Sequence, residues 1–213
     1  MEFSDFPHPY MTVDVLIFSI INGVLVILLT KRNKPPFEGS WALPGGFIRM
    51  DESLDEAAKR ITNEKGKMGE VYLEQLYSFG DIGRDPRGRV VSVSYFALVP
   101  EERTKQVEGW FPVDKLDKLS FDHLLMVKAG AARLKAKVTY SNIAVGLLPK
   151  NFRLSELQRV YEIILGRPLD KRNFRKKMTS LDLLIKVGET DKGEKRRPAM
   201  LYTFKETKQI FFK

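Results

Sequence analysis

The stretch that decides the fold is GGFIRMDESLDEAAKRITNEKGKM, residues 45–68. Ser53 followed by Glu56 forms a capping box, which predicts a loop that leads into a helix over residues 53–64. One face of this helix is apolar and should pack on a sheet, through Leu54, Ala57, Ala58 and Ile61. The other face carries charges four residues apart, which can form a ladder of Glu56, Arg60 and Glu64. The stretch opens like a catalytic loop followed by a helix, yet Ile61 and Lys65 within the helix are not acidic.

Outside this stretch, most of residues 1–140 show the alternating hydrophobic pattern of strands. Alternating or β-branched runs predict strands at residues 11–20, 24–30, 70–79, 90–99 and 109–113, and a second helix is predicted at residues 121–137. The apolar run 16–29 is too short to cross a membrane, and Asn22-Gly23 in its middle predicts a hairpin. Strands and helices in this order predict an α+β fold, with helices packed on a mixed sheet.

The end of the chain predicts a second, smaller domain. Residues 141–149 contain a proline and little periodicity, so we place a linker there, between a first domain at residues 1–140 and a second at residues 150–213. Helices are expected at residues 155–165 and 171–184, and strands at residues 185–187 and 200–204. Helix, turn, helix and hairpin together predict a winged helix-turn-helix domain.

The positive charge of the chain is concentrated in this second domain. The net charge is +9 at pH 7. Residues 1–149 hold 19 basic and 19 acidic side chains, whereas residues 150–213 hold 17 and 8. A strongly basic domain on a neutral body indicates nucleic acid or another polyanion as the partner. A basic domain without such a partner is the alternative.

Cysteine content and the first residues bear on the compartment. The chain has no cysteine, which fits a reducing compartment and excludes a disulfide framework. The start MEFSDFPHPY is acidic and contains proline, unlike a secretory signal. We therefore expect a cytoplasmic protein without membrane association.

Residues 46–68 resemble the box of the Nudix family, G-x5-E-x7-R-E-U-x-E-E-x-G-U, in which U is aliphatic. The matching positions are Gly46, Glu52, Arg60, Glu64 and Met68, and WALPGGF before the box is also family-like. The departures are Ile61, Thr62, Lys65 and Lys67. In Nudix hydrolases the carboxylates of this helix bind divalent metal. The resemblance implies a Nudix α/β/α sandwich with a mixed sheet.

The departures bear on catalysis. Mg²⁺ needs oxygen ligands, Ile61 offers none, and Lys65 places a positive charge near the metal position, so Glu64 is at most a weak ligand. We expect Glu52, Arg60 and Glu64 to be remnants of an active site with little or no hydrolysis. No cofactor should be required, and Mg²⁺ would be needed only if hydrolysis persists.

The loop FGDIGRDPRGR, residues 79–89, presents three arginines between two strands. Guanidinium groups suit a diphosphate because they donate hydrogen bonds in a planar fork, although a merely solvated loop is the alternative. RDPRGR resembles the segment that shapes the ADP-ribose pocket in ADP-ribose-type Nudix proteins. With Lys65 pairing with phosphate in place of a metal, the expected ligand-binding residues are Gly46, Phe47, Arg49, Lys65, Arg84, Arg87 and Arg89.

The second helix of the tail separates a buried side from a basic side. Asp170 is the expected N-cap, and the buried side is marked by Phe174, Met178 and Leu181. In a winged helix this helix enters the major groove and the wing lies near phosphates. The expected DNA-binding residues are Lys171, Arg172, Asn173, Arg175 and Lys176 in the helix, and Lys192, Lys195, Arg196 and Arg197 in the wing.

This two-part layout resembles the NrtR-type transcriptional regulators over nearly the whole chain. The resemblance implies a homodimer on a palindromic DNA operator, repression of NAD-biosynthesis genes, and release of DNA on binding ADP-ribose. Related Nudix regulators respond to a sugar such as arabinose, and PLDKRNFRKK, residues 168–177, is shared by both branches.

Three functions stay open at this point. We favour a ligand-responsive repressor with an impaired Nudix domain. The second is an active ADP-ribose pyrophosphatase with metal ligands from elsewhere, such as Glu101 or Glu102. The third is a nucleic-acid-binding module that has lost its ligand.

Overall fold

The computed structural model describes residues 7–189, 199–206 and 211–212. The predicted wing residues Lys192, Lys195, Arg196 and Arg197 lie outside these ranges. The strands are β1 (Tyr10–Ile21), β2 (Val24–Leu28), β3 (Thr30–Lys31), β4 (Trp41–Ala42), β5 (Gly45–Phe47), β6 (Tyr72–Phe79), β7 (Val90–Leu98), β8 (Trp110–Pro112), β9 (Phe152–Arg153), β10 (Leu184–Glu189) and β11 (Met200–Phe204). The helices are α1 (Leu54–Gly66), α2 (Glu101–Thr104), α3 (His123–Tyr140), α4 (Leu154–Leu165) and α5 (Lys171–Ser180), with 3-10 turns η2 (Val113–Lys115) and η3 (Ile143–Leu147).

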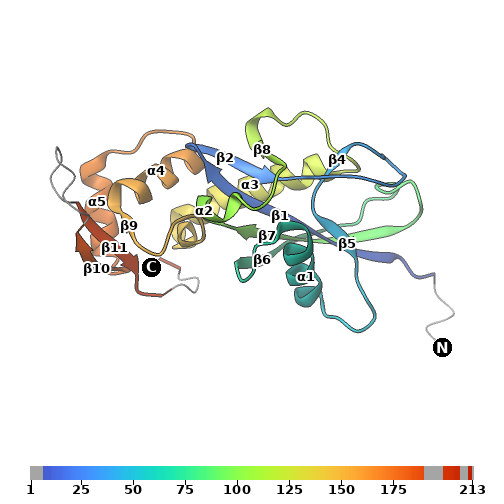
Figure 1. Cartoon of the computed structure of the whole chain (residues 1–213), viewed down its shortest axis with the longest axis horizontal. Helices are drawn as coiled ribbons and strands as arrows, with labels where there is room; N and C mark the ends of the chain where they lie inside the picture. The colour runs from blue at the N-terminus through green and yellow to red at the C-terminus, as the bar shows by residue number, and fades with distance from the viewer. Residues whose placement is uncertain (1–6, 190–198, 207–210, 213) are drawn as a thin grey trace.

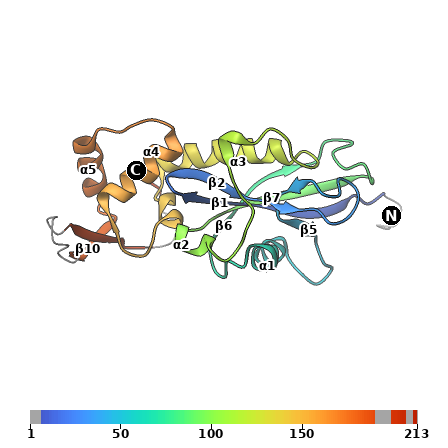
Figure 2. The same ribbon diagram turned by 45° about the horizontal axis from the view of Figure 1, so that its top comes forward.

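The first part of the chain is a sandwich around one mixed sheet, as predicted. The strand order is β6-β7-β1-β2-β8, and β5 pairs with β1 off this path. β1 is parallel to β7 and antiparallel to β2 and β5. α1 covers one face of the sheet and α3 the other (Figures 1 and 2). The capping box at Ser53 and Glu56 is formed, which explains where α1 begins.

β1 divides its side chains between the two layers. Because strand side chains alternate, Leu16, Phe18 and Ile20 pack toward α3, whereas Val13, Val15 and Ile17 pack toward α1. Thr12 and Asp14 continue the α3-facing series, but they are polar and buried. The apolar layer between β1 and α3 therefore gives way to buried polar groups near the start of β1.

The hairpin between β1 and β2 reaches the second domain. Asn22 and Gly23 both have positive φ, at 51° and 78°, so the apolar run is the predicted hairpin. The Asn22 amide donates to Glu101 Oε1 at 3.0 Å. A Cβ on Gly23 would lie 3.1 Å from the guanidinium of Arg159 in α4. Within the ranges described above, no helix is long and apolar enough to cross a membrane.

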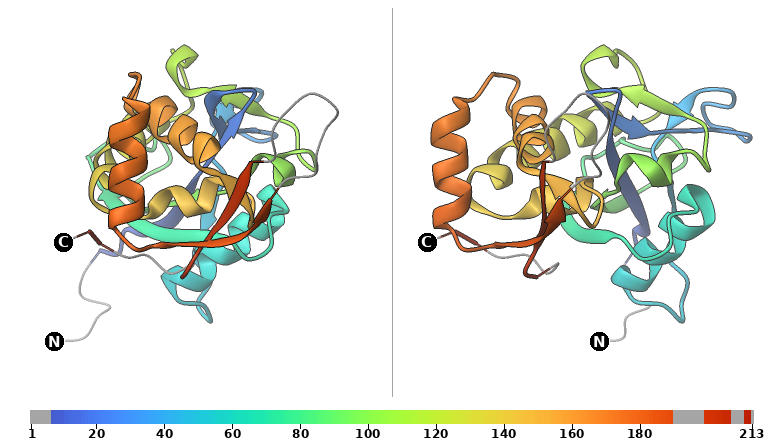
Figure 3. Two further views of the ribbon diagram at one scale, coloured as in Figure 1. Left: turned by 90° about the vertical axis from the view of Figure 1, so that its left-hand side faces the viewer. Right: turned by 60° about the vertical axis from the view of Figure 1, so that its left-hand side comes forward.

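The second domain is a winged helix, as predicted, with α4 and α5 beside the sheet β10-β11-β9 (Figure 3). Gly166 ends α4 in the left-handed conformation at φ 70°. The prediction of a helix to residue 184 was wrong, because α5 ends at Ser180 and Asp182 has a left-handed φ of 51°. β9 was not predicted, since two residues are too few to show a strand pattern.

The segment predicted as a linker, residues 141–149, is packed rather than exposed. η3 lies in it, and Ile143 and Ala144 have no exposed surface. A Cβ on Gly146 would lie 2.7 Å from Leu98 Cβ in β7, so the turn sits directly on the sheet. One apolar cluster continues from Leu16 in the sheet to Phe204 in the winged helix. The two domains share a core, and the boundaries at 140 and 150 remain a prediction.

Candidate functional site

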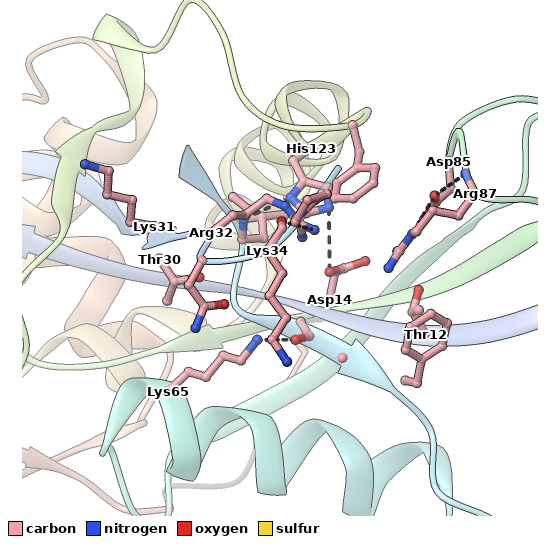
Figure 4. Close-up of a pocket in the computed structure, with 18 of the residues that line it drawn as sticks. Thr12, Asp14, Thr30, Lys31, Arg32, Lys34, Lys65, Asp85, Arg87 and His123 are labelled. Carbon is pink, nitrogen blue, oxygen red and sulfur yellow. Dashed lines mark hydrogen bonds and ion pairs between the residues drawn. The ribbon is translucent and has the colours of Figure 1, made fainter. Parts of the chain in front are cut away.

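A cavity of about 530 Å³ opens at the polar end of β1 (Figure 4). Its walls come from β1, β3, β5, α1, the loop between β6 and β7, and the start of α3. Five predicted ligand-binding residues line it, namely Gly46, Phe47, Lys65, Arg84 and Arg87. Arg49 and Arg89 do not. Arg49 instead lies 3.4 Å from Glu64, and Arg89 donates to the Gly80 carbonyl at 2.5 Å.

The two arginines from the loop of residues 79–89 are held by carboxylates. The Arg84 side chain is 4% exposed and donates to both oxygens of Asp122, at 2.9 and 2.7 Å, which ties the loop to the start of α3. Arg87 donates to both oxygens of Asp85 at 2.9 and 2.6 Å, and 43% of its side chain is exposed. These bonds hold the pKa of Asp85 below its usual value. Arg87 therefore has a fixed direction and an accessible guanidinium.

Lys65 reaches the cavity from α1. Its ammonium donates to the Gly45 carbonyl. Although the residue as a whole is exposed, desolvation of the ammonium lowers the pKa of Lys65, while Asp14 and Glu64 oppose this shift. A cation thus stands in the position for which the sequence predicted one.

Further cations of the cavity were not predicted. Lys31, Arg32 and Lys34 follow β2, in the run KRNK that is visible in the sequence. Arg32 donates to the Pro36 carbonyl at 2.7 Å, and its guanidinium lies 4.7 Å from the centre of the Phe121 ring. Burial and the neighbouring Arg87 lower the pKa of Arg32. The cavity is therefore strongly cationic on several sides.

Asp14 and His123 form an acidic end of the cavity, and neither was predicted. The Leu43 amide donates to His123 Nδ1 at 2.9 Å, so the imidazole proton is on Nε2. His123 Nε2 lies 3.7 Å from Asp14 Oδ1. Burial lowers the pKa of His123, which keeps the ring neutral. Ser92 donates its hydroxyl to Asp14 Oδ2 at 2.5 Å.

The residues predicted to be catalytic remnants lie outside the cavity lining, and they hold the loop against α1. Arg60 donates to Glu52 through Nη2 and Nε, at 2.5 and 2.7 Å, and these bonds lower the pKa of Glu52 to about 2. Glu64 is 3.4 Å from both Arg60 and Arg49. This network is a structural clamp on the loop before α1.

The metal implied by the fold family does not fit these residues. Ile61 is 1% exposed and packs among apolar side chains, so it provides no ligand. Lys65 contributes a cation, and Glu64 is shared by two arginines. Within the described part of the chain, no three His, Asp or Glu side chains gather as a metal site would require. A carboxylate at position 61 would also have to enter an apolar cluster.

Lys67 stands at the position of the box glycine, and the free-energy cost of this replacement can be measured. It caps α1 at φ 52° and ψ 33°, a left-handed conformation that suits glycine. Lys67→Gly is expected to stabilise the protein by about 0.5–1 kcal/mol, read from urea unfolding. Lys59→Gly, within α1, is the control and should destabilise by about 1 kcal/mol. Destabilisation by both changes would contradict the left-handed cap.

α5 presents the predicted DNA-binding residues on one surface. Asp170 caps the helix by accepting from the Asn173 amide at 2.8 Å, as predicted. Phe174 and Met178 are buried against the domain. The exposed side carries Lys171, Arg172, Asn173, Arg175 and Lys176. The helix therefore offers a basic face of the kind that enters a major groove.

Fold and site together define a class of protein, in which a Nudix domain with a small-molecule cavity is joined to a winged helix. The NUDIX domain family matches residues 11–131, and the family described as NrtR DNA-binding winged helix domain matches residues 144–204. The chain belongs to the NrtR family of Nudix proteins.

Two relatives, one of them represented by two crystal structures, show how far the similarity extends. An Acinetobacter baylyi protein named ADPR responsive transcriptional repressor NtrR is 42% identical over 94% of this chain and 84% of its own. The crystal structure of Shewanella oneidensis NrtR complexed with a 27mer DNA has a TM-score of 0.83 at 36% identity, covering 92% and 93% of the two chains. The NUDIX domain of that NrtR complexed with ADP ribose has a TM-score of 0.53 at 32% identity, covering 63% and 94%.

Proposed function

We propose that this chain is a transcriptional repressor that binds an operator through its winged helix and releases it when the Nudix domain binds ADP-ribose. One observation carries the proposal: a single chain joins a cationic cavity to an exposed basic helix face through a shared core. The relatives named for ADP-ribose response and crystallised with DNA and ADP-ribose support it.

The proposal assigns roles to individual residues. Gly46, Phe47, Lys65, Arg84 and Arg87 line the cavity and are proposed to surround the effector, with Lys65 and Arg87 toward its phosphates. Lys171, Arg172, Asn173, Arg175 and Lys176 are proposed to contact DNA, as are the predicted wing residues. We place the protein in the cytoplasm as a homodimer on a palindromic operator that controls NAD-metabolism genes.

Binding without hydrolysis is part of the proposal. The residues at the metal position of the box are unsuited to a divalent cation, so no metal is required for the effector to bind. A positively charged ammonium at Lys65 can pair with phosphate directly. Mg²⁺ would matter only if a hydrolytic activity persisted.

The test is DNA release by an intact effector. Fluorescence anisotropy of labelled DNA from the neighbouring promoter should show an affinity that ADP-ribose lowers by about 5- to 150-fold, the usual range of coupling between two sites. The ADP-ribose should be recovered intact after incubation with Mg²⁺ or Mn²⁺. DNA affinity that ignores ADP-ribose would contradict the repressor. Turnover of about one per second would instead identify an enzyme.

A further inference from the structure

The polar end of the cavity contains a hydroxyl group that the protein itself does not satisfy. Thr12 is 9% exposed and lines the cavity. Among the side chains the structure describes, its Oγ1 is the buried polar atom without a hydrogen-bond partner. Buried polar groups in native proteins are almost always paired, so such an atom needs an explanation. A ligand group in the cavity provides one, since Thr12 lies along its wall (Figure 4).

Asp14 adds a carboxylate with unused acceptor capacity on the same face of β1. Ser92 donates to one oxygen at 2.5 Å, and His123 Nε2 lies 3.7 Å from the other, beyond hydrogen-bond distance. Among the described residues, no lysine or arginine forms an ion pair with Asp14, whereas a carboxylate can accept about four hydrogen bonds. The carboxylate packs closely against Gly45, since a Cβ on Gly45 would lie 1.8 Å from Asp14 Oδ1. Only glycine at position 45 leaves room for Asp14 in this place.

The charges around Asp14 restrict what it can bind. A phosphate would be repelled by the carboxylate, and an amine would be repelled by Arg32, Lys65 and Arg87 on the surrounding walls. A divalent cation would find only Asp14 and His123 there, because no group of three His, Asp or Glu side chains gathers among the described residues. A neutral hydroxyl group can donate a hydrogen bond to Asp14, accept one from His123 Nε2–H, and either donate to or accept from the Thr12 hydroxyl. Such a group satisfies all three side chains. Sugar hydroxyls have this chemistry.

We propose that Thr12, Asp14 and His123 form a subsite for the hydroxyl groups of a sugar in the effector, while the phosphates lie toward Lys34, Lys65 and Arg87. The inference deepens the proposed function and rests on its effector class. It divides the cavity into a cationic region that binds phosphate and a region around Asp14 that rejects phosphate and accepts sugar hydroxyls. The subsite should therefore give a ribose-bearing diphosphate a higher affinity than a bare diphosphate.

The test is selective loss of the sugar-bearing ligand. Calorimetric titrations of the full chain would use ADP-ribose directly and inorganic pyrophosphate as its competitor. Asp14→Asn should weaken the binding of ADP-ribose by about 10-fold or more, since a hydrogen bond to a charged group is lost. The affinity for pyrophosphate should be unchanged or higher. Thr12→Val should weaken ADP-ribose by about 3- to 10-fold without affecting pyrophosphate. Thr104→Val is the matched control, a buried threonine remote from the cavity whose hydroxyl bonds the Glu101 carbonyl at 2.7 Å.

The possible outcomes separate this inference from the proposed function. Equal weakening of both ligands by Asp14→Asn, or unchanged ADP-ribose binding in both variants, would overturn the subsite and leave the effector standing. If the unaltered protein ignored ADP-ribose but bound arabinose, and Asp14→Asn lost that binding, the proposed effector would fall and the subsite would stand. If it bound neither, both would fall. Thermal unfolding of each variant establishes that the fold is retained, and Thr12→Val keeps the test decisive if Asp14→Asn does not fold.

Discussion

Replacing Arg172 and Arg175 together with alanine is expected to weaken operator binding by about 30-fold or more, because each arginine contact to a base edge contributes about 1–3 kcal/mol. Both residues are exposed on α5, and within the described chain neither guanidinium is held by a carboxylate. The log–log dependence of affinity on salt should also become shallower by about 0.9 for each phosphate contact removed. Anisotropy titrations at several salt concentrations measure both quantities.

A matched control separates contact from overall charge. Lys59→Ala with Lys128→Ala removes an equal number of positive charges from exposed positions on α1 and α3, in the sandwich domain. Operator affinity should change little in this variant, because surface charges beyond a Debye length of about 8–10 Å are screened. Equal losses in the two double variants would mean that net charge alone, and not the face of α5, determines binding.

The second large effect concerns the core that the two domains share. Phe152→Ala should lower the free energy of unfolding by about 3–5 kcal/mol, as is typical for removal of a buried aromatic ring. Phe152 is 1% exposed, and its ring centre is 5.2 Å from that of Phe204. Both belong to the cluster that continues to Leu16 in the large sheet. We therefore expect one cooperative transition in urea for the unaltered protein and for the variant.

Ile82→Ala provides the comparison for this prediction. Ile82 is 93% exposed, so its removal should change stability by less than about 0.5 kcal/mol. Two separate transitions in the unaltered protein, with only one of them shifted by Phe152→Ala, would show that the sandwich and the winged helix unfold independently. The shared cluster would then contribute little to holding them together.

The parts of the fold that follow from local chemistry could be predicted from the sequence. The capping box at Ser53, the turn at Asn22-Gly23 and the cap at Asp170 each specify a backbone conformation within a few residues, and all three are formed. The end of α5 and strand β9 could not be predicted from the sequence. β9 exists because Phe152 pairs with Tyr202, which is distant in sequence, and residues 141–149 are buried because they meet β7.

The candidate site was predicted where one motif supplies it and missed where distant segments meet. Gly46, Phe47 and Lys65 come from the box, and their place at the cavity follows from its geometry. Arg32, Asp14 and His123 come from three separate segments, and only the fold brings them together. A signal for Asp14 was present, since an acidic residue in an otherwise apolar strand is seldom buried without a role. The directions of Arg49 and Arg89 depend on partners that the loop sequence does not reveal.

One uninterrupted strand runs from the cavity to the winged helix. β1 carries Asp14 at the cavity, and after Ile21 its hairpin tip meets Arg159 of α4, about 23 Å further along at the usual rise per residue. A strand hydrogen-bonded to neighbours on both sides cannot stretch or shorten appreciably. An axial displacement of β1 at the cavity would therefore be passed along the strand to α4, which shares its apolar cluster with Phe174 and Met178 of α5.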